Sequence, residues 1–279
     1  MMARIIGAQR EGTRRAGSVI HVSHAERYDG FALDLDGVVW LAGEPIPGSV
    51  EAIAALRAAG KRVVFITNDP RSTRADYVRR LREIGVDVSI ADVLTSGTAV
   101  GEAISREAPG ARVFVAGSDA LRRELEAFDL RSVSGRGDAA DAVVVGGHSG
   151  FDYAELRDAA VKVRGGADLW ATNRDPVYPT PQGPAPGTGA LVAAIETAAG
   201  RRARVAGKPE PPMFEAARRR LGVERPAIVG DSLDADIAGG ARAGFGTVLV
   251  LSGRAQRADL DGSPVRPDLV LSDLRALVS

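Results

Sequence analysis

Four short polar signatures in the sequence carry side chains that could together hydrolyse a phosphate ester. In chain order they are Asp34-Leu35-Asp36-Gly37, Thr67-Asn68, Gly207-Lys208-Pro209 and Gly230-Asp231-Ser232-Leu233-Asp234-Ala235-Asp236. A carboxylate can attack phosphorus to form an aspartyl-phosphate, and a second acidic group can protonate the leaving oxygen and later activate water. Carboxylates and backbone carbonyls suit Mg²⁺. Hydroxyl, ammonium and backbone N–H groups can hold the other phosphate oxygens.

Apolar segments that read as strands precede these signatures. We expect strands at residues 31–35, 62–67 and 227–229, while the segment 205–209 could be either a strand or a loop. Ligands of an open parallel sheet bind outside the carboxyl ends of its strands. The four signatures should therefore meet at one edge of a sheet.

Each signature alone has an ordinary structural explanation. Asp34 and Asp36 could be turn residues, Thr67-Asn68 could cap a helix, and Gly230-Asp231 could open the acidic first turn of one. Gly207-Lys208-Pro209 lacks the spacing of a nucleotide-binding P-loop. Their joint occurrence, in this order and after apolar segments, favours an active site.

The elements around these signatures alternate between strand and helix. Helical periodicity appears at residues 48–59, 73–84, 213–221 and 237–243, and further strands are expected at 247–251 and 269–271. Alternation at this spacing predicts an α/β fold with a Rossmann-like parallel sheet.

A middle region has an α/β pattern of its own. Strands are expected at 112–116, 142–145 and 168–172, and helices at 121–128, 153–163 and 190–199, whereas the Pro/Gly-rich segment 176–187 should not form regular structure. The sequence therefore predicts a core at residues 29–97 and 193–279 and a second α/β domain inserted at 98–192. Residues 1–28 are expected to form a loosely ordered N-terminal arm.

Composition narrows the possible chemistry. The 36 basic and 36 acidic residues balance, which gives no argument for nucleic acid or an anionic membrane as a partner. The absence of cysteine excludes a thiol nucleophile and a disulfide framework, and fits a cytoplasmic protein. No apolar run approaches the roughly 18 residues that span a bilayer. Of the three histidines, only His148 could serve a Ser-His-Asp triad, and no nucleophile-elbow sequence supports one.

The four signatures, in order, resemble the four motifs of haloacid dehalogenase phosphatases. The resemblance extends from about Asp29 to Gly253. The stretches Thr172-Asn173-Arg174-Asp175-Pro176 and Pro186-Gly187-Thr188-Gly189-Ala190-Leu191 also look like subclass IIA, in which an α/β cap domain is inserted after the second motif. That subclass includes p-nitrophenylphosphatases, phosphoglycolate phosphatase and pyridoxal phosphate phosphatase.

The resemblance implies a role for each matching residue. Asp34 would be the nucleophile and a magnesium ligand. Asp36 would be the general acid/base, with its backbone carbonyl facing the metal. The phosphoryl group would be held by Thr67, the backbone N–H of Asn68 and Lys208, which would also contact the nucleophile. Asp231 would ligate Mg²⁺, and Asp236 would orient metal-bound water, with Asp234 the weaker candidate in that motif.

Three features bear on the substrate. The second motif continues with Asp69, where asparagine is commoner in the subclass, and this change could alter substrate entry. His148 and Tyr178 are the candidate specificity residues, although a surface-loop role for His148 is slightly favoured. Histidine tends to occupy the position of Tyr178 in pyridoxal phosphate phosphatases, which puts that substrate in doubt. Trp40 and Trp170 are assigned to packing.

The sequence therefore predicts a Mg²⁺-dependent phosphomonoester hydrolase that acts on a small phosphorylated metabolite, such as a sugar phosphate, a nucleotide or phosphoglycolate, through an aspartyl-phosphate. Two alternatives stay open: a phosphotransferase or mutase with the same intermediate, and a non-catalytic protein that binds phosphorylated metabolites. The resemblance also implies a homodimer formed through the cap.

Overall fold

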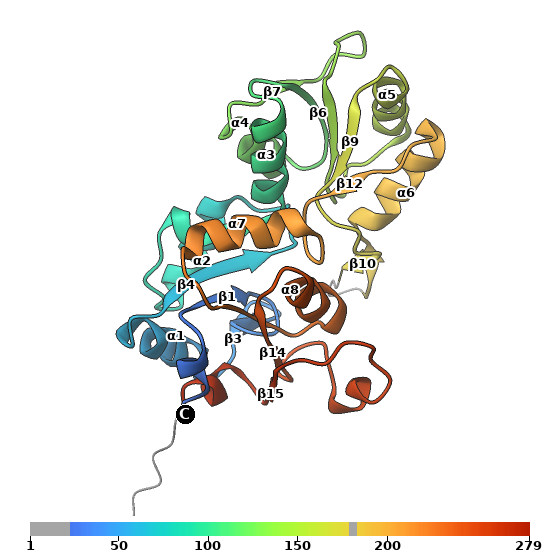
Figure 1. Ribbon diagram of the computed structural model, residues 1–279. Coiled ribbons are helices and arrows are strands. Elements are labelled where there is room, and N and C mark those ends of the chain that lie inside the picture. Colours follow the sequence, from blue (N-terminus) through green and yellow to red (C-terminus); the bar gives the residue numbers. More distant parts are fainter. Residues whose placement is uncertain (1–22, 179–182) are drawn as a thin grey trace, which may run out of the picture.

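Two parallel sheets organise the chain in the computed structural model, which describes residues 23–178 and 183–279 (Figure 1). The first sheet has six strands in the order β15-β14-β13-β1-β4-β5, and the second has five in the order β12-β9-β8-β6-β7. Neighbouring strands in both sheets run parallel. The predicted α/β class is confirmed.

The first sheet draws its strands from both ends of the chain. They are β1 (Gly30–Asp34), β4 (Arg62–Thr67), β5 (Val93–Thr95), β13 (Pro226–Gly230), β14 (Gly246–Val250) and β15 (Leu269–Leu271). β1 lies between β13 and β4, so the ends of three strands that precede predicted site residues are neighbours. Their near-continuous apolar sequences fit a sheet that is covered on both faces.

Helices cover both faces of this sheet because alternate strand side chains point to opposite sides. Phe31 and Leu33 belong to one apolar cluster, which includes residues of α1 (Ser49–Ala58), α2 (Arg74–Glu83) and η5 (Leu274–Leu277). Ala32 belongs to a second cluster, with residues of α3 (Ser96–Glu107) and α7 (Pro211–Leu221). This second cluster continues into strands β6, β8 and β9 of the second sheet and thus joins the two sheets.

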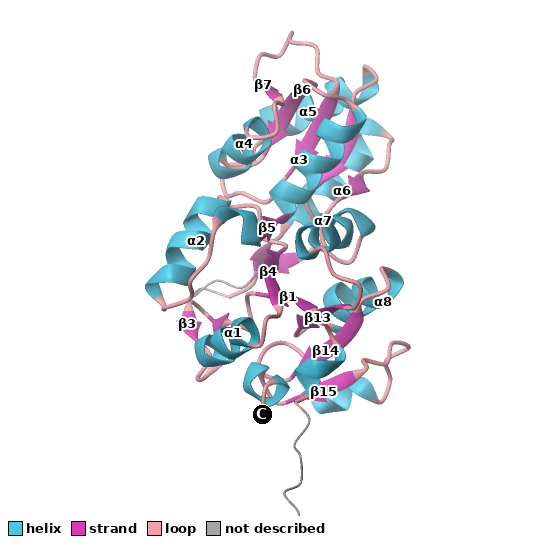
Figure 2. Ribbon diagram, turned by 60° about the vertical axis from the view of Figure 1, so that its left-hand side comes forward, coloured by secondary structure: helices cyan, strands magenta, loops and turns pink. Residues whose placement is uncertain are grey.

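The second sheet lies above the first in both views (Figures 1 and 2). Its strands are β6 (Arg112–Ala116), β7 (Arg131–Val133), β8 (Ala142–Val145), β9 (Asp168–Ala171) and β12 (Arg204–Val205), and its helices are α4 (Asp119–Glu126), α5 (Tyr153–Arg164) and α6 (Thr188–Ala199). β12 lies beyond residue 192, where the inserted domain was expected to end. The division into core and inserted domain at particular residues stays a prediction.

Shorter elements complete the described chain. They are η1 (His24–Arg27), β2 (Trp40–Leu41), β3 (Glu44–Pro45), η2 (Ile90–Asp92), β10 (Val177–Tyr178), β11 (Ala185–Pro186), η3 (Leu233–Ala238), α8 (Gly239–Arg242) and η4 (Arg257–Leu260). β2 and β3 form an antiparallel hairpin directly after the first signature.

Three expectations from the sequence are wrong in detail. The Pro/Gly-rich segment does contain regular structure, since β10 and β11 pair antiparallel, and a two-residue edge strand tolerates the missing N–H of Pro186; residues 179–182 lie outside the described ranges. The helix expected at 237–243 begins earlier, as the π-helical turn η3 capped by Ser232.

The third concerns the N-terminal arm. Residues 1–22 lie outside the described part of the chain, but residues 23–28 are packed on the C-terminal segment. The hydroxyl of Ser23 donates to the carbonyl of Leu277 at 2.9 Å, and Ala25 is buried in the first apolar cluster. These contacts attach the segment that precedes β1 to η5.

Within the described residues, 23–178 and 183–279, no helix is both long enough and apolar enough to cross a membrane.

A buried ion-pair network around Glu196 fixes the end of α6. Glu196 is 7% exposed and accepts hydrogen bonds from Arg174, Arg202 and the backbone N–H of Ala203. The hydrogen bonds from Arg174 are the main cause that lowers the pKa of Glu196 to about 2. A carboxyl whose pKa is lower in the folded state stabilises the fold above its unfolded value of 4.5, and this contribution is lost as pH falls toward 2.

Glu196→Gln should therefore lower the free energy of unfolding at pH 7 by about 1–2 kcal/mol, a modest value because Arg202 is largely exposed and screened. Urea unfolding at pH 7 and at pH 3 measures the effect. We expect the difference between wild type and variant to shrink at pH 3. A difference of equal size at both pH values would contradict the charge-based role.

Candidate active site

The four signatures meet at the carboxyl edge of the first sheet. Asp34 ends β1, Thr67 ends β4, and Gly230 ends β13, the neighbour of β1 on its other side. The Gly207-Lys208-Pro209 signature arrives from the second sheet, because β12 ends at Val205 and the signature follows it outside any strand.

Lys208 lies at the centre of the site, between residues of the first and fourth signatures. Its Nζ lies 2.8 Å from Oδ1 of Asp34 and 2.7 Å from Oδ1 of Asp236, and its side chain is 3% exposed. Burial alone would lower the pKa of Lys208, but the carboxylates of Asp236 and Asp34 outweigh it and raise that pKa. Lys208 is therefore a permanent cation that joins the first signature to the fourth.

Asp34 is held in one orientation. Its Oδ1 accepts hydrogen bonds from Lys208 and from the backbone N–H of Leu35, the latter at 2.8 Å. Burial raises the pKa of Asp34 well above its usual value, the charge of Lys208 opposes this shift, and the neighbouring charges of Asp236 and Asp231 add to it. The site thus holds more negative charge than Lys208 alone can balance.

Three carboxylates form a compact oxygen cluster. One oxygen of each of Asp34, Asp231 and Asp236 lies within 4.8 Å of the others. Burial, followed by the charge of Asp236, raises the pKa of Asp231. Asp236 is fully buried, and its two oxygens are already taken by Lys208 and by the backbone N–H of Ser232. Asp234 is exposed and stands apart from this cluster.

Two glycines allow the chain to close around Asp231. A methyl group at Gly37 or at Gly253 would lie 2.1 Å from Oδ2 of Asp231, and Gly37 also has a φ of +79°, which side chains rarely adopt. The hydroxyl of Ser252 donates to the carbonyl of Gly37 at 2.7 Å, and the N–H of Arg254 donates to Asp231 at 2.7 Å. Glycine is therefore required at position 37 for two reasons: a side chain would clash with Asp231, and the turn needs a positive φ.

The Asn68 side chain joins the second signature to the third. Its Oδ1 accepts from the backbone N–H of Lys208 at 2.7 Å, and its Nδ2 donates to the carbonyl of the same residue at 2.8 Å. The carbonyl of Asn68 accepts from Ser96 and from Asn173 at 2.6 and 2.7 Å. Asn68 was predicted to contribute only its backbone N–H, so this pairing is a positioning role that the sequence did not reveal.

Asp36 is the exposed member of the first signature. Its Oδ1 accepts a hydrogen bond from the indole Nε1 of Trp40 at 3.0 Å. Desolvation by its surroundings raises the pKa of Asp36, the Trp40 hydrogen bond opposes the shift, and the charge of Asp69 adds to it. Trp40 was assigned to packing alone; it is 1% exposed, yet it also contacts a predicted catalytic residue.

Of the two predicted specificity residues, Tyr178 contacts the segment that follows the second signature, at Arg71. The guanidinium of Arg71 lies 4.2 Å from the centre of the Tyr178 ring and also forms a two-pronged ion pair with Asp69. In contrast, Nε2 of His148 lies 2.7 Å from Glu155, and the ring packs edge-on against Phe151. The specificity roles of both residues stay predictions.

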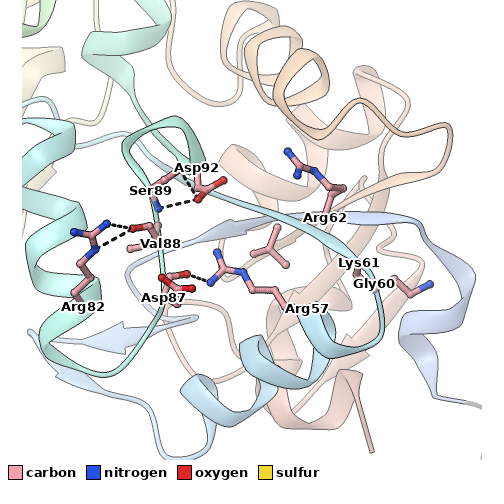
Figure 3. Close-up of a pocket in the computed structure, with 10 residues that line it drawn as sticks. Arg57, Gly60, Lys61, Arg62, Arg82, Asp87, Val88, Ser89 and Asp92 are labelled. Atoms are coloured by element: carbon pink, nitrogen blue, oxygen red, sulfur yellow. Dashed lines mark hydrogen bonds between the residues drawn. The ribbon is translucent and has the colours of Figure 1, made fainter.

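A separate cavity of about 440 Å³ lies at the opposite end of β4, beside Arg62 (Figure 3). Basic side chains line it, but Arg57 donates to the carbonyl of Asp87 and Arg82 to that of Val88. These arginines fix the loop after α2. The cavity is thus a structural groove, away from the acidic cluster.

Comparisons with known proteins agree with this geometry. Residues 31–131 match a family model described as haloacid dehalogenase-like hydrolase, and residues 205–277 match a second, described as HAD-hydrolase-like. The chain is 38% identical to the D-glycerol 3-phosphate phosphatase of Mycobacterium tuberculosis, over 91% of this chain and 72% of the relative. The chain belongs to the haloacid dehalogenase-like hydrolase family.

One further relative and one solved structure show which phosphatases of the family this chain is similar to. Human chronophin is 39% identical over 81% of this chain and 82% of its own length. The crystal structure of the Mycobacterium tuberculosis glycerol phosphate phosphatase in complex with magnesium superposes with a TM-score of 0.86 and 36% identity, covering 92% of this chain and 78% of that one. The predicted resemblance to the subclass IIA phosphatases of this family is confirmed.

Proposed function

We propose that this chain is a Mg²⁺-dependent phosphomonoester hydrolase of small phosphorylated metabolites, with Asp34 as its nucleophile. The observation that carries the proposal is the buried contact of Lys208 with both Asp34 and Asp236. This contact sets a fixed cation beside a fixed carboxylate at the edge of a parallel sheet. Such an arrangement suits a reaction in which negative charge develops on transferred phosphate oxygens.

The donor set fits a magnesium ion. Asp34, Asp231 and Asp236 offer only oxygen, which Mg²⁺ prefers, and no histidine stands among them. Asp34 and Asp231 would be direct ligands, together with the backbone carbonyl of Asp36. Asp236 would act through metal-bound water, since both its oxygens already accept hydrogen bonds from the protein. A bound cation would supply positive charge that offsets the excess of carboxylates.

In the first half-reaction, a carboxylate oxygen of Asp34 attacks phosphorus as the bond to the leaving oxygen breaks. Asp36 donates its proton to that oxygen, so the product leaves as an alcohol and Asp36 becomes a carboxylate. Lys208, the hydroxyl of Thr67 and the backbone N–H of Asn68 hold the phosphate oxygens.

In the second half-reaction, Asp36 accepts a proton from water as the water oxygen attacks phosphorus. The bond between phosphorus and Asp34 breaks, phosphate leaves, and Asp34 is again a carboxylate. The raised pKa of Asp36 suits a group that must be protonated in one step and ionised in the next. Asp175, which contacts Asn68 at 3.4 Å from the loop after β9, would help to close the site over the substrate.

Substrate identity is proposed at the level of a class. The curated relative of Mycobacterium tuberculosis is named for D-glycerol 3-phosphate, so this ester heads the panel to be tested, followed by sugar phosphates, nucleotides, phosphoglycolate and pyridoxal phosphate. The homodimer through the inserted domain and the cytoplasmic location stay predictions.

Phosphate release in the presence and absence of metal tests the proposal. With Mg²⁺ we expect turnover of p-nitrophenyl phosphate and of at least one ester in the panel. EDTA should abolish release, and excess Mg²⁺ should restore it, because Lys208 alone does not offset the charge of three carboxylates and a phosphate dianion, and a divalent cation would supply the rest. Phosphate transferred to a sugar phosphate, without release to water, would instead favour a phosphotransferase. No turnover of any ester would favour a binding protein.

A further inference from the structure

Asp36 takes its orientation from Trp40. The indole Nε1 of Trp40 donates to Oδ1 of Asp36 at 3.0 Å. Within the described part of the chain, the Asp36 side chain makes no other hydrogen bond. A carboxyl group that is otherwise exposed to solvent would exchange among several side-chain rotamers. The contact therefore decides how an exposed acid/base faces the site.

Trp40 is well placed to impose that orientation, because it is itself fixed. Its side chain is 1% exposed, and it stacks on the ring of Tyr77 at 6.4 Å with an angle of 8° between the planes. The guanidinium of Arg80 lies 4.6 Å from the indole. Both partners come from α2, so the indole is clamped by a helix rather than by a loop.

The backbone between the two residues forms a closed turn. The N–H of Gly37 donates to the carbonyl of Trp40 at 2.7 Å, and the N–H of Trp40 donates to that of Leu35 at 3.2 Å. The hairpin of β2 and β3 continues directly from this turn. The turn thus holds the backbones of Asp36 and Trp40 close enough for the indole to reach the carboxyl.

The chemistry of the indole gives this contact a direction. An indole N–H can only donate a hydrogen bond, so the oxygen that it contacts must be an acceptor. We propose that Trp40 is a positioning residue that holds Oδ1 of Asp36 as an acceptor and thereby leaves the transferable proton on Oδ2. This inference rests on the proposed phosphatase function and names a residue that the four family motifs do not include.

The proton balance follows from that assignment. As Asp34 forms its bond to phosphorus, the electron pair of the breaking P–O bond stays on the leaving oxygen. The proton on Oδ2 of Asp36 moves to this oxygen, and Asp36 becomes a carboxylate that keeps its hydrogen bond from Trp40. In the second half-reaction the proton from water returns to Oδ2.

Packing alone would predict a different pattern of kinetic effects. An alkoxide is a poor leaving group and needs the proton, whereas p-nitrophenolate leaves readily without one. Loss of a positioned acid should therefore slow alkyl esters selectively. A general loosening of the site should slow both kinds of ester equally.

The test uses Trp40→Phe, which keeps an aromatic ring and removes the N–H. We expect kcat/KM, which reports the first half-reaction, to fall about 10–100-fold for the best alkyl phosphate and less than about threefold for p-nitrophenyl phosphate. Trp170→Phe is the matched control, since Trp170 lies on β9 and is likewise buried. It should leave the ratio of the two values unchanged.

A second variant covers the case in which Trp40→Phe does not fold. In the Trp170→Phe background, the remaining tryptophan is replaced biosynthetically with 3-benzothienylalanine, in which sulfur occupies the place of the N–H. The same selective loss is expected, because ring size is kept. Equal losses for both esters, or no loss, would overturn the role of Trp40. Wild-type protein that hydrolyses neither ester would instead refute the proposed function.

Discussion

Asp34→Asn should lower kcat for phosphate release from p-nitrophenyl phosphate by at least about 1000-fold, the scale of loss seen when an enzyme's nucleophile is removed. The amide oxygen of asparagine is a far weaker nucleophile than a carboxylate and forms no aspartyl-phosphate. The change is isosteric and removes one charge from a cluster of three carboxylates, so the variant should fold at least as stably as the wild type. Steady-state release with saturating Mg²⁺ measures the effect.

Asp234→Asn is the matched control for this variant. Asp234 belongs to the same acidic region but is exposed and stands outside the cluster, so kcat should stay within about twofold of the wild-type value. If Asp34→Asn kept more than a few per cent of wild-type activity, the assignment of the nucleophile would be wrong.

Lys208→Ala has the second largest expected effect, a fall in kcat/KM of about 100–1000-fold. The loss removes the cation that contacts Asp34 and would hold the phosphoryl group. It also leaves Asp236, which is fully buried, without its ion-pair partner. In EDTA the free energy of unfolding should therefore fall by about 3 kcal/mol, as measured by urea unfolding.

Lys162→Met separates these two effects. Lys162 is another buried lysine, but its Nζ donates to the backbone carbonyls of Gly135 and Asp138, far from the acidic cluster along the chain. This variant should lose stability while its kcat/KM stays near the wild-type value. A mild kinetic effect of Lys208→Ala would remove the phosphoryl-holding role from Lys208.

The framework of the site could be predicted because two regular rules apply to it. Strands with near-continuous apolar sequences, such as 62–67, are recognisable without tertiary information. The carboxyl ends of neighbouring parallel strands must lie side by side, so Asp34 and Thr67 had to meet. Lys208 was harder to place, since a turn after β12 brings it in, and only the likeness of its signature to a family motif suggested its role.

Short or weakly patterned elements could not be predicted. β5 has three residues, and α3 begins Ser96-Gly97-Thr98, a sequence with poor intrinsic helix propensity. The first six residues of the helix, 96–101, are all buried, so packing rather than propensity stabilises this helix. Tertiary context overrode the local signal.

The positioning residues were missed for a related reason. The hydrogen bond from Trp40 to Asp36 depends on a closed turn. The two hydrogen bonds between Asn68 and Lys208 join residues separated by 140 positions. Sequence periodicity carries no information about such contacts. They become visible only when the loops that follow the strands are placed.

Detection of a covalent phosphoryl-enzyme would show whether Asp34 attacks phosphorus. Wild-type protein is mixed with a ³²P-labelled phosphate ester and Mg²⁺, quenched in acid within one turnover, and digested for peptide mapping. We expect label on the peptide that contains Asp34, released by hydroxylamine as an acyl phosphate is, and no label on Asp34→Asn. Rapid product formation with no labelled protein, or label at another residue, would contradict it.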